Sequence, residues 1–369
     1  MKIKVFFLLM LIPLLSGCLP TSTLDQVLMV EGEGFDYLGN GKIMGTVVIP
    51  SFEQGASQNG QGGGMQSISS TIRSLSGVTY DGKSLADKFQ SEGQEILRVG
   101  SMKTMIYDKK LAKFGLKNQL SFRNRDPDVP SAISIAVVDG STKELLTATD
   151  YQTKVPIARY IQHMILQNTQ QNYPSTNLRY FLDSYYGAYM DPFMPLIKKS
   201  GDHLEMQGLA LFRNDKYIMS IPDSKMFVFK MLYEPFNQGF YDCLLPSGKH
   251  IVVRNVESSV KYKVEDGNGV SPKVVASLQI KGYVRQASPK TVSTKAASTV
   301  SKKVADDLKH NAEKMVRQLQ RKGVDPLRIG DTVRSATRHF DGKTWNERYP
   351  NTNFSCQIHV EVIQTGISS

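Results

Sequence analysis

Two stretches near the C-terminus decide the fold class. Residues 301–322 read SKKVADDLKHNAEKMVRQLQRK, and residues 353–364 read NFSCQIHVEVIQ. In the first, apolar residues recur every three or four positions, at Val304, Leu308, Ala312, Met315 and Leu319. This spacing predicts an amphipathic helix. The second stretch alternates apolar and polar residues, which predicts a strand with one buried face. A helix and a strand in this succession indicate an α+β fold.

The rest of the chain also mixes predicted strands and helices. Strands are expected at residues 26–31, 42–50, 102–107, 131–138, 226–233, 250–264 and 273–285, with a hairpin over 207–221 that turns at Asn214-Asp215. Helices are expected at residues 84–97, 108–114, 117–124, 155–172, 175–190 and 325–340. The Asn40-Gly41 pair predicts a tight turn before the second strand. Residues 54–66 are rich in Gly and Gln and predict a flexible loop.

The length sets the number of domains. The chain has 369 residues, of which 40% are apolar, and domains average roughly 150 residues. We expect three mixed α/β domains with antiparallel sheets and packed helices. The boundaries we predict are a signal peptide at 1–17, an N-terminal α+β domain at 18–198, a small middle domain with the β-hairpin at 199–245, and a C-terminal α+β domain with the long basic helix at 246–369.

The N-terminus is similar to the lipobox of bacterial lipoproteins. Lys2 and Lys4 precede an apolar run from Val5 to Leu15, which is too short for a stable membrane span. The run ends in Leu-Ser-Gly-Cys, with the cysteine at Cys18. In a lipobox the cysteine thiol receives a diacylglycerol and the signal is cut just before it. We therefore expect Cys18 to carry diacylglycerol and palmitate, an anchored extracytoplasmic mature protein, and no other cofactor.

Charge and cysteine content leave several interpretations open. The net charge is +11, and removing Lys2 and Lys4 with residues 1–17 leaves +9. Residues 281–340 alone hold fourteen Lys or Arg and five Asp or Glu. The helix predicted at 301–322 lies in this basic region. Its basic side is interpreted as a solvated face, a contact with anionic lipid headgroups or a contact with a partner protein. Nucleic acid is not expected as a partner. Cys243 and Cys356 are either a disulfide or two buried thiols.

The sequence contains no catalytic or metal-binding motif. Gly32-Glu33-Gly34 lacks the third glycine of a dinucleotide fingerprint and predicts a bulge or turn. Ser258-x-x-Lys261 lies in a strand pattern without the other lactamase motifs. Asp306-Asp307 is interpreted as charge compensation near a helix N-terminus. The sequence has six histidines, at His163, His203, His250, His310, His339 and His359. No two are three or four residues apart, as metal ligands on one helix face would be.

Four stretches, in order along the chain, resemble the Ger(x)C family. These are VLMVEGEGFD at 27–36; MKTMIY at 102–107 with LAKFGL at 111–116 and RDPD at 125–128; GLALFRNDK at 208–216; and KGVDP at 322–326 with Ile329-Gly330, Trp345, Tyr349-Pro350 and Thr365-Gly366. Members of this family are the lipoprotein C subunits of bacterial spore germinant receptors, of the GerAC, GerBC and GerKC type. The matches cover nearly the whole mature chain, although the 54–66 loop is longer than usual and Asp223–Lys230 departs from the pattern.

The resemblance implies three α+β domains and no enzymatic activity. It also implies a complex with membrane-embedded A and B subunits at the spore inner membrane, and a role in nutrient-triggered germination through complex assembly or signal relay. Two other classes compete. A substrate-binding lipoprotein of a transport system predicts two similar α/β lobes around a cleft. An envelope hydrolase needs a carboxylate pair or a metal site.

Overall fold

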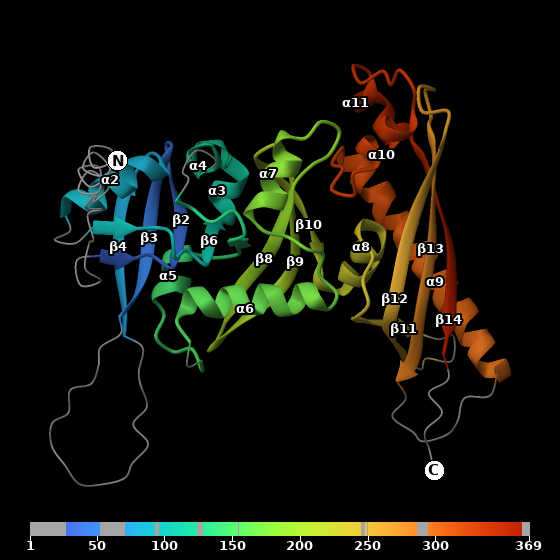
Figure 1. The fold of residues 1–369 in the computed structure, drawn as a ribbon, viewed down its shortest axis with the longest axis horizontal. Coiled ribbons are helices and arrows are strands. Elements are labelled where there is room, and N and C mark those ends of the chain that lie inside the picture. Colours follow the sequence, from blue (N-terminus) through green and yellow to red (C-terminus); the bar gives the residue numbers. More distant parts are fainter. Residues whose placement is uncertain are drawn as a thin grey trace, which may run out of the picture.

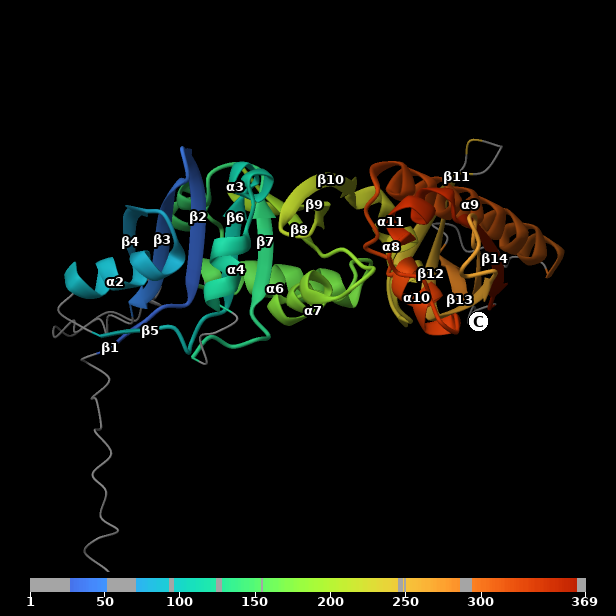
Figure 2. The same ribbon diagram turned by 90° about the horizontal axis from the view of Figure 1, so that it is seen from above.

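Two large β-sheets lie side by side along the long axis of the molecule (Figures 1 and 2). The computed structural model describes residues 27–51, 71–92, 96–123, 128–153, 155–244, 248, 250–285 and 294–363. Cys18 and the Gly/Gln-rich stretch 54–66 lie outside these ranges. Strands and helices alternate in both halves, so the predicted α+β class is confirmed.

The N-terminal half is built on an eight-stranded sheet with the order β10-β9-β8-β7-β6-β2-β3-β4. Its strands are β2 (Gly32–Gly39), β3 (Lys42–Ser51), β4 (Thr71–Thr79), β6 (Thr104–Asp108), β7 (Ser134–Val138), β8 (Phe193–Ser200), β9 (His203–Arg213) and β10 (Lys216–Pro222). Strands β2, β6, β7 and β8 run parallel to one another, whereas the outer pairs β2–β3, β3–β4, β8–β9 and β9–β10 are antiparallel. The expectation of antiparallel sheets is therefore wrong for the centre of this sheet. Parallel neighbours need long crossovers, and the helices between these strands provide them.

Helices cover both faces of this sheet. They are α2 (Gly82–Glu92), α3 (Lys109–Phe114), α4 (Lys117–Arg123), α5 (Thr142–Thr147), α6 (Ile157–Gln170) and α7 (Leu178–Tyr186). Successive side chains of β6 point to opposite faces of the sheet and so enter two different cores. Met105 and Tyr107 pack with α2, α3, α4 and α7 on one face, and Ile106 packs with α5 and α6 on the other. A short parallel pair, β1 (Val27–Met29) and β5 (Ile96–Arg98), lies beside the sheet. The N-terminal half is thus a three-layer unit.

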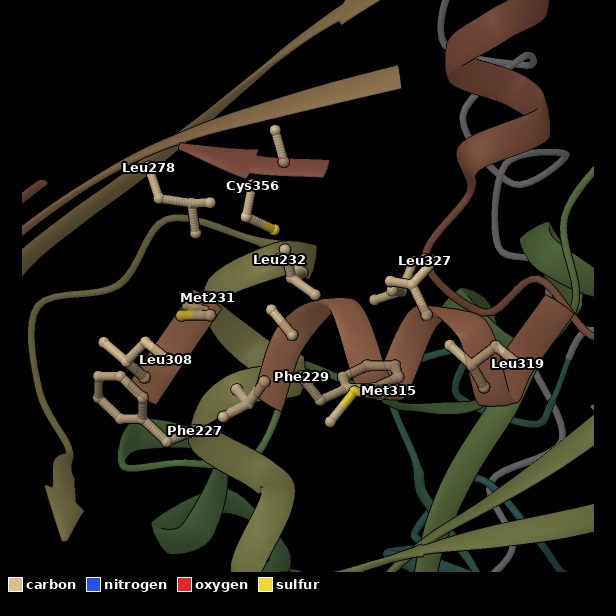
Figure 3. Close-up of a cluster of buried hydrophobic side chains, with 14 of the residues drawn as sticks. Phe227, Phe229, Met231, Leu232, Leu278, Leu308, Met315, Leu319, Leu327 and Cys356 are labelled. Carbon is tan, nitrogen blue, oxygen red and sulfur yellow. The ribbon is translucent and has the colours of Figure 1, made fainter. Parts of the chain in front are cut away.

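The C-terminal half is a four-stranded sheet with helices on one side. Its strands, in spatial order, are β11 (Phe240–Leu244), β12 (His250–Glu265), β13 (Lys273–Arg285) and β14 (Asn353–Val362). Only β13 and β14 pair in parallel. The helices are α8 (Met226–Tyr233), α9 (Thr294–Lys322), α10 (Ile329–Ala336) and α11 (Trp345–Arg348), with 3₁₀ turns at Asp223–Lys225 and Tyr349–Asn351. The predicted apolar stripe of α9 is buried against α8 and the sheet (Figure 3).

Several local predictions differ from the structure. Residues 226–233 form helix α8 rather than a strand. Their side chains from Met226 to Leu232 are all buried, and an apolar run without periodicity does not distinguish a buried helix from a buried strand. The helix predicted at 84–97 ends at Glu92 and is capped by Asp81, whose carboxylate accepts a 2.8 Å hydrogen bond from Ser84 N. Helix α10 covers only part of the predicted 325–340.

Both predicted hairpin turns are confirmed. Asn40 and Gly41 have φ angles of 51° and 75° between β2 and β3, and Asn214 has 53° between β9 and β10. Asparagine and glycine tolerate this left-handed region better than other residues. The division into three domains stays a proposal. Its boundary after residue 198 falls within β8, and residues 245–247 at the next boundary lie outside the described ranges.

Candidate functional site at the junction of the two sheets

Two helices end at the junction between the halves of the molecule. Helix α6 of the N-terminal half ends at Gln170, and helix α9 of the C-terminal half ends at Lys322. The last carbonyl oxygens of a helix have no partner within the helix, and they carry the negative end of its dipole. Each of these helix ends receives a cation from the other half of the molecule.

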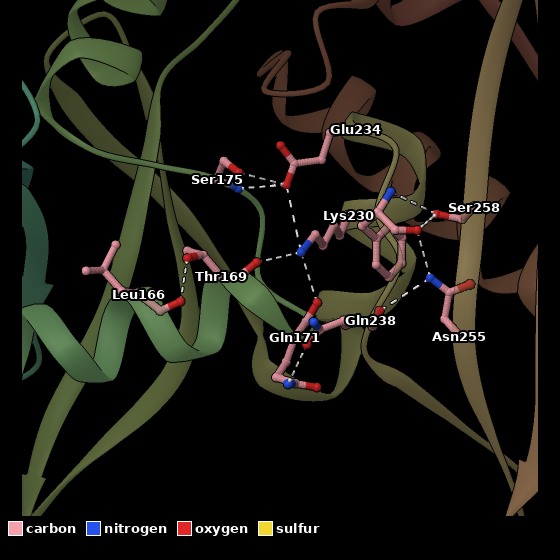
Figure 4. Close-up of polar contacts among 10 residues, drawn as sticks. Leu166, Thr169, Gln171, Ser175, Lys230, Glu234, Gln238, Asn255 and Ser258 are labelled. Carbon is pink, nitrogen blue, oxygen red and sulfur yellow. Dashed lines mark hydrogen bonds and ion pairs between the residues drawn. The ribbon is translucent and has the colours of Figure 1, made fainter.

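Lys230 of α8 binds the end of α6. Its Nζ donates hydrogen bonds of 2.6 Å to Thr169 O and 2.9 Å to Gln171 O, and it lies 3.9 Å from the Glu234 carboxylate (Figure 4). The side chain is only 3% exposed, and this burial lowers the pKa of Lys230. Glu234 in turn accepts bonds from the backbone N and the Oγ of Ser175. A buried ammonium group thus joins α8 to the end of α6.

The residues that follow α6 also pair with the edge of the C-terminal sheet. Asn172 Oδ1 accepts a 3.0 Å bond from Phe240 N, and Asn172 Nδ2 donates a 3.0 Å bond to Phe240 O. Gln171 Nε2 donates to Gln238 Oε1 at 3.2 Å (Figure 4). A side-chain amide therefore occupies the place that a neighbouring strand would take beside β11, which protects this sheet edge.

Arg213 at the end of β9 binds the end of α9. Its Nε donates a 3.0 Å bond to Gly323 O, and its Nη2 donates a 2.7 Å bond to Lys322 O. Gly323 has a φ of +62° and ends the helix, as predicted. Arg213 belongs to the 208–216 stretch and Gly323 to the 322–326 stretch, so two of the four family-like stretches meet at this contact.

Asp191 and Asp325 reinforce the same junction. Asp325 N donates to Asp191 Oδ2 at 2.8 Å, and Asp191 N donates to Asp325 O at 2.9 Å. The Asp325 carboxylate caps α10 by accepting from Ile329 N at 3.0 Å and from Gly330 N at 2.6 Å. Burial raises the pKa of Asp325 to about 7, and it also raises the pKa of Asp191.

A cavity of about 480 Å³ lies over this contact, lined by the 187–191 loop, Arg213, Asn214, Gly323, Asp325, Trp345, Asn346 and Tyr349. Several polar groups on its wall already have partners within the protein. Arg213 bonds Gly323 O, Asp191 bonds Asp325 N, and Tyr349 Oη donates a 2.8 Å bond to Val324 O. Within the described ranges, no three His, Cys, Asp or Glu side chains gather to hold a metal ion. The geometry is that of a structural joint.

The Gly32-Glu33-Gly34 stretch serves helix packing in β2. A Cβ on Gly32 would lie 2.9 Å from the Cβ of Ala158 in α6, and one on Gly34 would lie 2.7 Å from Leu146 Cδ1 in α5. Asp36, two residues on, caps α5 by accepting a 2.7 Å bond from Thr142 N. The glycines therefore let two helices approach the sheet closely, which corrects the prediction of a bulge or turn.

The family-like stretches form a connected series through the N-terminal half. Tyr37 N, just after the first stretch, donates to Asp108 Oδ1 at 3.2 Å, and the Tyr37 and Phe114 rings stack at 4.6 Å. The second stretch meets the third where Leu116 N donates to Asp215 O at 3.0 Å. Together with the Arg213–Gly323 contact, these bonds connect β2 with α9.

The other candidate residues have structural roles. Ser258 Oγ donates a 2.9 Å bond to Phe236 O within the β12 region, away from any nucleophile arrangement with Lys261. Asp307 accepts a 2.5 Å bond from Tyr241 Oη. Because α9 begins at Thr294, Asp306 and Asp307 are far from its N-terminus, and their interpretation as charge compensation there is wrong.

The two described cysteines are free and buried. Cys243 lies in β11 and Cys356 in β14, at opposite edges of the four-stranded sheet. Of the two alternatives, the structure therefore has buried thiols. Burial raises the pKa of Cys356 to about 12, which keeps this thiol protonated.

Sequence reasoning missed Lys230, Asn172 and the pairing of Arg213 with α9. The only local signal for Lys230 is its position as the single charge in the apolar run MFVFKMLY at 226–233. A lysine in such a run needs an internal partner. Asn172 carries no sequence signal, because its partner Phe240 is 68 residues away.

No helix among the described residues is long and apolar enough to cross a membrane. Residues 21–199 match the family model described as "Spore germination protein N-terminal domain", and residues 207–366 match "Spore germination B3/ GerAC like, C-terminal". Spore germination protein GerQC of Bacillus cereus is 28% identical over 373 residues, which covers all of both chains. The putative spore germination protein YfkR of Bacillus subtilis (strain 168) is 23% identical and covers 95% of this chain and 92% of its own.

A solved structure shares the fold. The crystal structure of the GerBC protein superimposes with a TM-score of 0.57 at 12% identity, and the match covers 90% of this chain and 97% of that one.

Proposed function

Because the chain belongs to the GerAC/GerBC-like family of spore germination proteins, whose members are non-catalytic C subunits of germinant receptors, we propose that it is a lipid-anchored receptor subunit that acts with membrane A and B subunits. Family membership implies a germinant receptor complex and membrane association. The protein is then needed for nutrient-triggered germination, through assembly of the complex or relay of its ligand-bound state.

The joint between the halves is the observation that carries this proposal. Lys230 binds the end of α6 and Arg213 binds the end of α9, so each half holds a helix end of the other. Breaking such a joint costs both the hydrogen bonds and the interaction of each cation with the helix dipole. A force or contact applied to one sheet is therefore transmitted to the other, which suits an assembly or relay subunit better than two independent domains.

The anchor follows from the lipobox at Cys18. One acyl chain gives marginal membrane binding, whereas two on one residue hold a protein stably. Nine peptide steps separate Cys18 from Val27, where β1 begins, and they span at most about 30 Å. The start of β1 is then held within about 30 Å of the bilayer, on the extracytoplasmic face of the spore inner membrane. Confinement to this plane raises its effective concentration for membrane partners.

A substrate-binding lipoprotein is the competing function. It predicts two similar α/β lobes that face each other across a cleft. The structure instead has a three-layer half on an eight-stranded sheet and a half on a four-stranded sheet with helices on one side. The two halves are unlike in strand number, order and layering, which weighs against that function.

The test is a germination assay in the native host. Release of dipicolinic acid is followed against a panel of amino acids, sugars and nucleosides, in spores that lack the protein and in spores with the gene restored. We expect loss of the response to one germinant class and its recovery on restoration. A normal response to the whole panel in spores that also lack other receptors would overturn the proposal.

A further inference from the structure

A second, smaller groove lies between strand β10 and helix α9. Its floor is apolar, with Met219 and Ile221 on the strand side and Met315 and Leu319 on the helix side. The free volume is about 60 Å³, which is room for one aliphatic side chain. It is separate from the junction cavity and shares no lining residue with it.

Both walls of the groove carry a lysine. Lys314 is exposed on α9. Lys225 is half-buried in the 3₁₀ turn that follows β10, where its Nζ donates a 2.7 Å bond to the Asn311 amide oxygen. Within the described part of the chain, neither lysine forms an ion pair with a carboxylate. The groove therefore combines an apolar floor with two positive charges that no described carboxylate neutralises.

The strand side of the groove is a sheet edge. Strand β10 pairs with β9 on one side, and no described strand pairs with its other side. An edge strand presents backbone N–H and C=O groups that a further strand can bind. The opposite end of the same junction shows how such an edge is closed, because Asn172 bonds the Phe240 backbone beside β11. Among the described residues, no side chain bonds the open side of β10 in this way. The regular part of this edge lies between the register shift after Tyr217 and the strand end at Pro222, which has no N–H.

We propose that the β10–α9 groove binds an extended, acidic segment of a partner protein. The segment adds as a strand beside β10, places one large apolar side chain between Met219 and Met315, and sets carboxylates against Lys225 and Lys314. Strand addition next to a helix supplies affinity through backbone bonds and specificity through side-chain pockets. This inference goes beyond the proposed function, because it depends on neither the lipid anchor nor the receptor.

The test uses the purified full chain in detergent and defined probes. A fluorescein-labelled peptide that alternates Asp with Ile and Leu is compared with the same peptide carrying Lys in place of Asp, and binding is read by anisotropy. We expect the acidic peptide to bind more tightly. The double substitution Lys225→Glu and Lys314→Glu should weaken its binding by about tenfold or more, and it should favour the lysine peptide.

Two controls isolate the groove. Lys302 and Lys309 are exposed on the same helix outside the groove, and their double reversal to Glu should leave acidic-peptide binding unchanged. Gln318→Trp fills the groove without removing a charge, and it should also weaken binding, so the test does not depend on a folded charge-reversal variant. N-methylation of alternate peptide amides should abolish binding in one register and spare it in the other.

Three outcomes would overturn the inference. One is equal binding of the acidic and lysine peptides. Another is an equal loss of binding for the groove and control charge reversals, which would reflect net charge alone. The third is that the double substitution Lys225→Glu and Lys314→Glu loses binding to phosphatidylglycerol vesicles but keeps binding to the acidic peptide. The groove would then be a lipid contact. If the peptides bind as expected but deletion spores respond normally to every germinant in the panel, only the proposed function is refuted.

Discussion

Arg213 and Gly323 lie 110 residues apart in the sequence, yet the Nε of Arg213 donates a 3.0 Å hydrogen bond to the carbonyl oxygen of Gly323. This contact joins the β9–β10 hairpin of one half to the last turn of α9 in the other. The Lys230 contact with the end of α6 runs in the opposite direction across the same junction. The two halves are therefore locked by reciprocal helix caps, and most of the following predictions test this arrangement.

Replacing Arg213 with Ala should lower the free energy of unfolding, because it removes a contact that joins the two halves. The change removes charged hydrogen bonds to Lys322 O and Gly323 O on a partly solvated surface, which we expect to cost about 1 kcal/mol. Urea unfolding of the purified chain measures the loss. Lys216→Ala on the same hairpin is the control and should change the unfolding free energy by less than about 0.5 kcal/mol. Equal effects of the two substitutions would contradict the capping role of Arg213.

Lys230→Met should be the most destabilising single change at the junction. It leaves Thr169 O, Gln171 O and the Glu234 carboxylate without their buried cation, and removing one partner of such a group costs about 3 kcal/mol. The matched control is Lys263→Met, because Lys263 pairs with Glu265 on an exposed strand face. If both variants unfolded at the same urea concentration as the wild type, Lys230 would have no role in joining the halves.

The free energy of unfolding should fall as the pH rises from about 4 to about 7, because Asp325 titrates differently in the folded and unfolded protein. Burial raises the pKa of Asp325 from 3.8 in the unfolded chain to about 7 in the folded protein. The folded state therefore binds more protons than the unfolded state between these values, and the contribution of Asp325 is full below about pH 4 and lost above about pH 7. Urea unfolding at a series of pH values should show this decline.

Asp325→Asn removes the titrating group at the same position. The variant should be less stable at pH 5, because an amide cannot accept both the Ile329 N and Gly330 N bonds. Its stability should nevertheless depend less on pH between 4 and 7 than that of the wild type. An unchanged slope would assign the pH dependence to other carboxyl groups, such as Asp108, whose pKa burial raises to about 6.

Gly34→Ala should strain the contact between β2 and α5. The added methyl group would lie 2.7 Å from Leu146 Cδ1 and from Thr142 Oγ1, and overpacking of this kind costs about 1–3 kcal/mol. Gly100→Ala is a suitable control, since its nearest neighbour, Asp128 O, is 3.7 Å away. Thermal unfolding should show a lower midpoint for the first variant only, and equal midpoints would refute close packing as the reason for the glycine.

Elements with a clear period could be predicted from the sequence, and contacts across the junction could not. The α9 stripe and the alternation in β14 were predictable because burial on one face imposes spacings of 3.6 and 2 residues. Helix α8 was mistaken for a strand because it is buried on all sides and has no such period. Its single lysine was the one sign of a buried cation. The partners of Lys230 and Arg213 lie about 60 to 110 residues away, and no local pattern encodes a pairing of that kind.

The most direct test of the account compares two cysteine substitutions in spores. Cys18→Ala removes the proposed lipid attachment, whereas Cys243→Ala removes a buried thiol in β11 that has no part in anchoring. Germinant dose–response curves and membrane fractionation are measured at matched protein levels. We predict that Cys18→Ala alone releases the protein from the membrane fraction and abolishes the response to one germinant class. A normal response from spores whose Cys18→Ala protein has left the membrane would contradict the account.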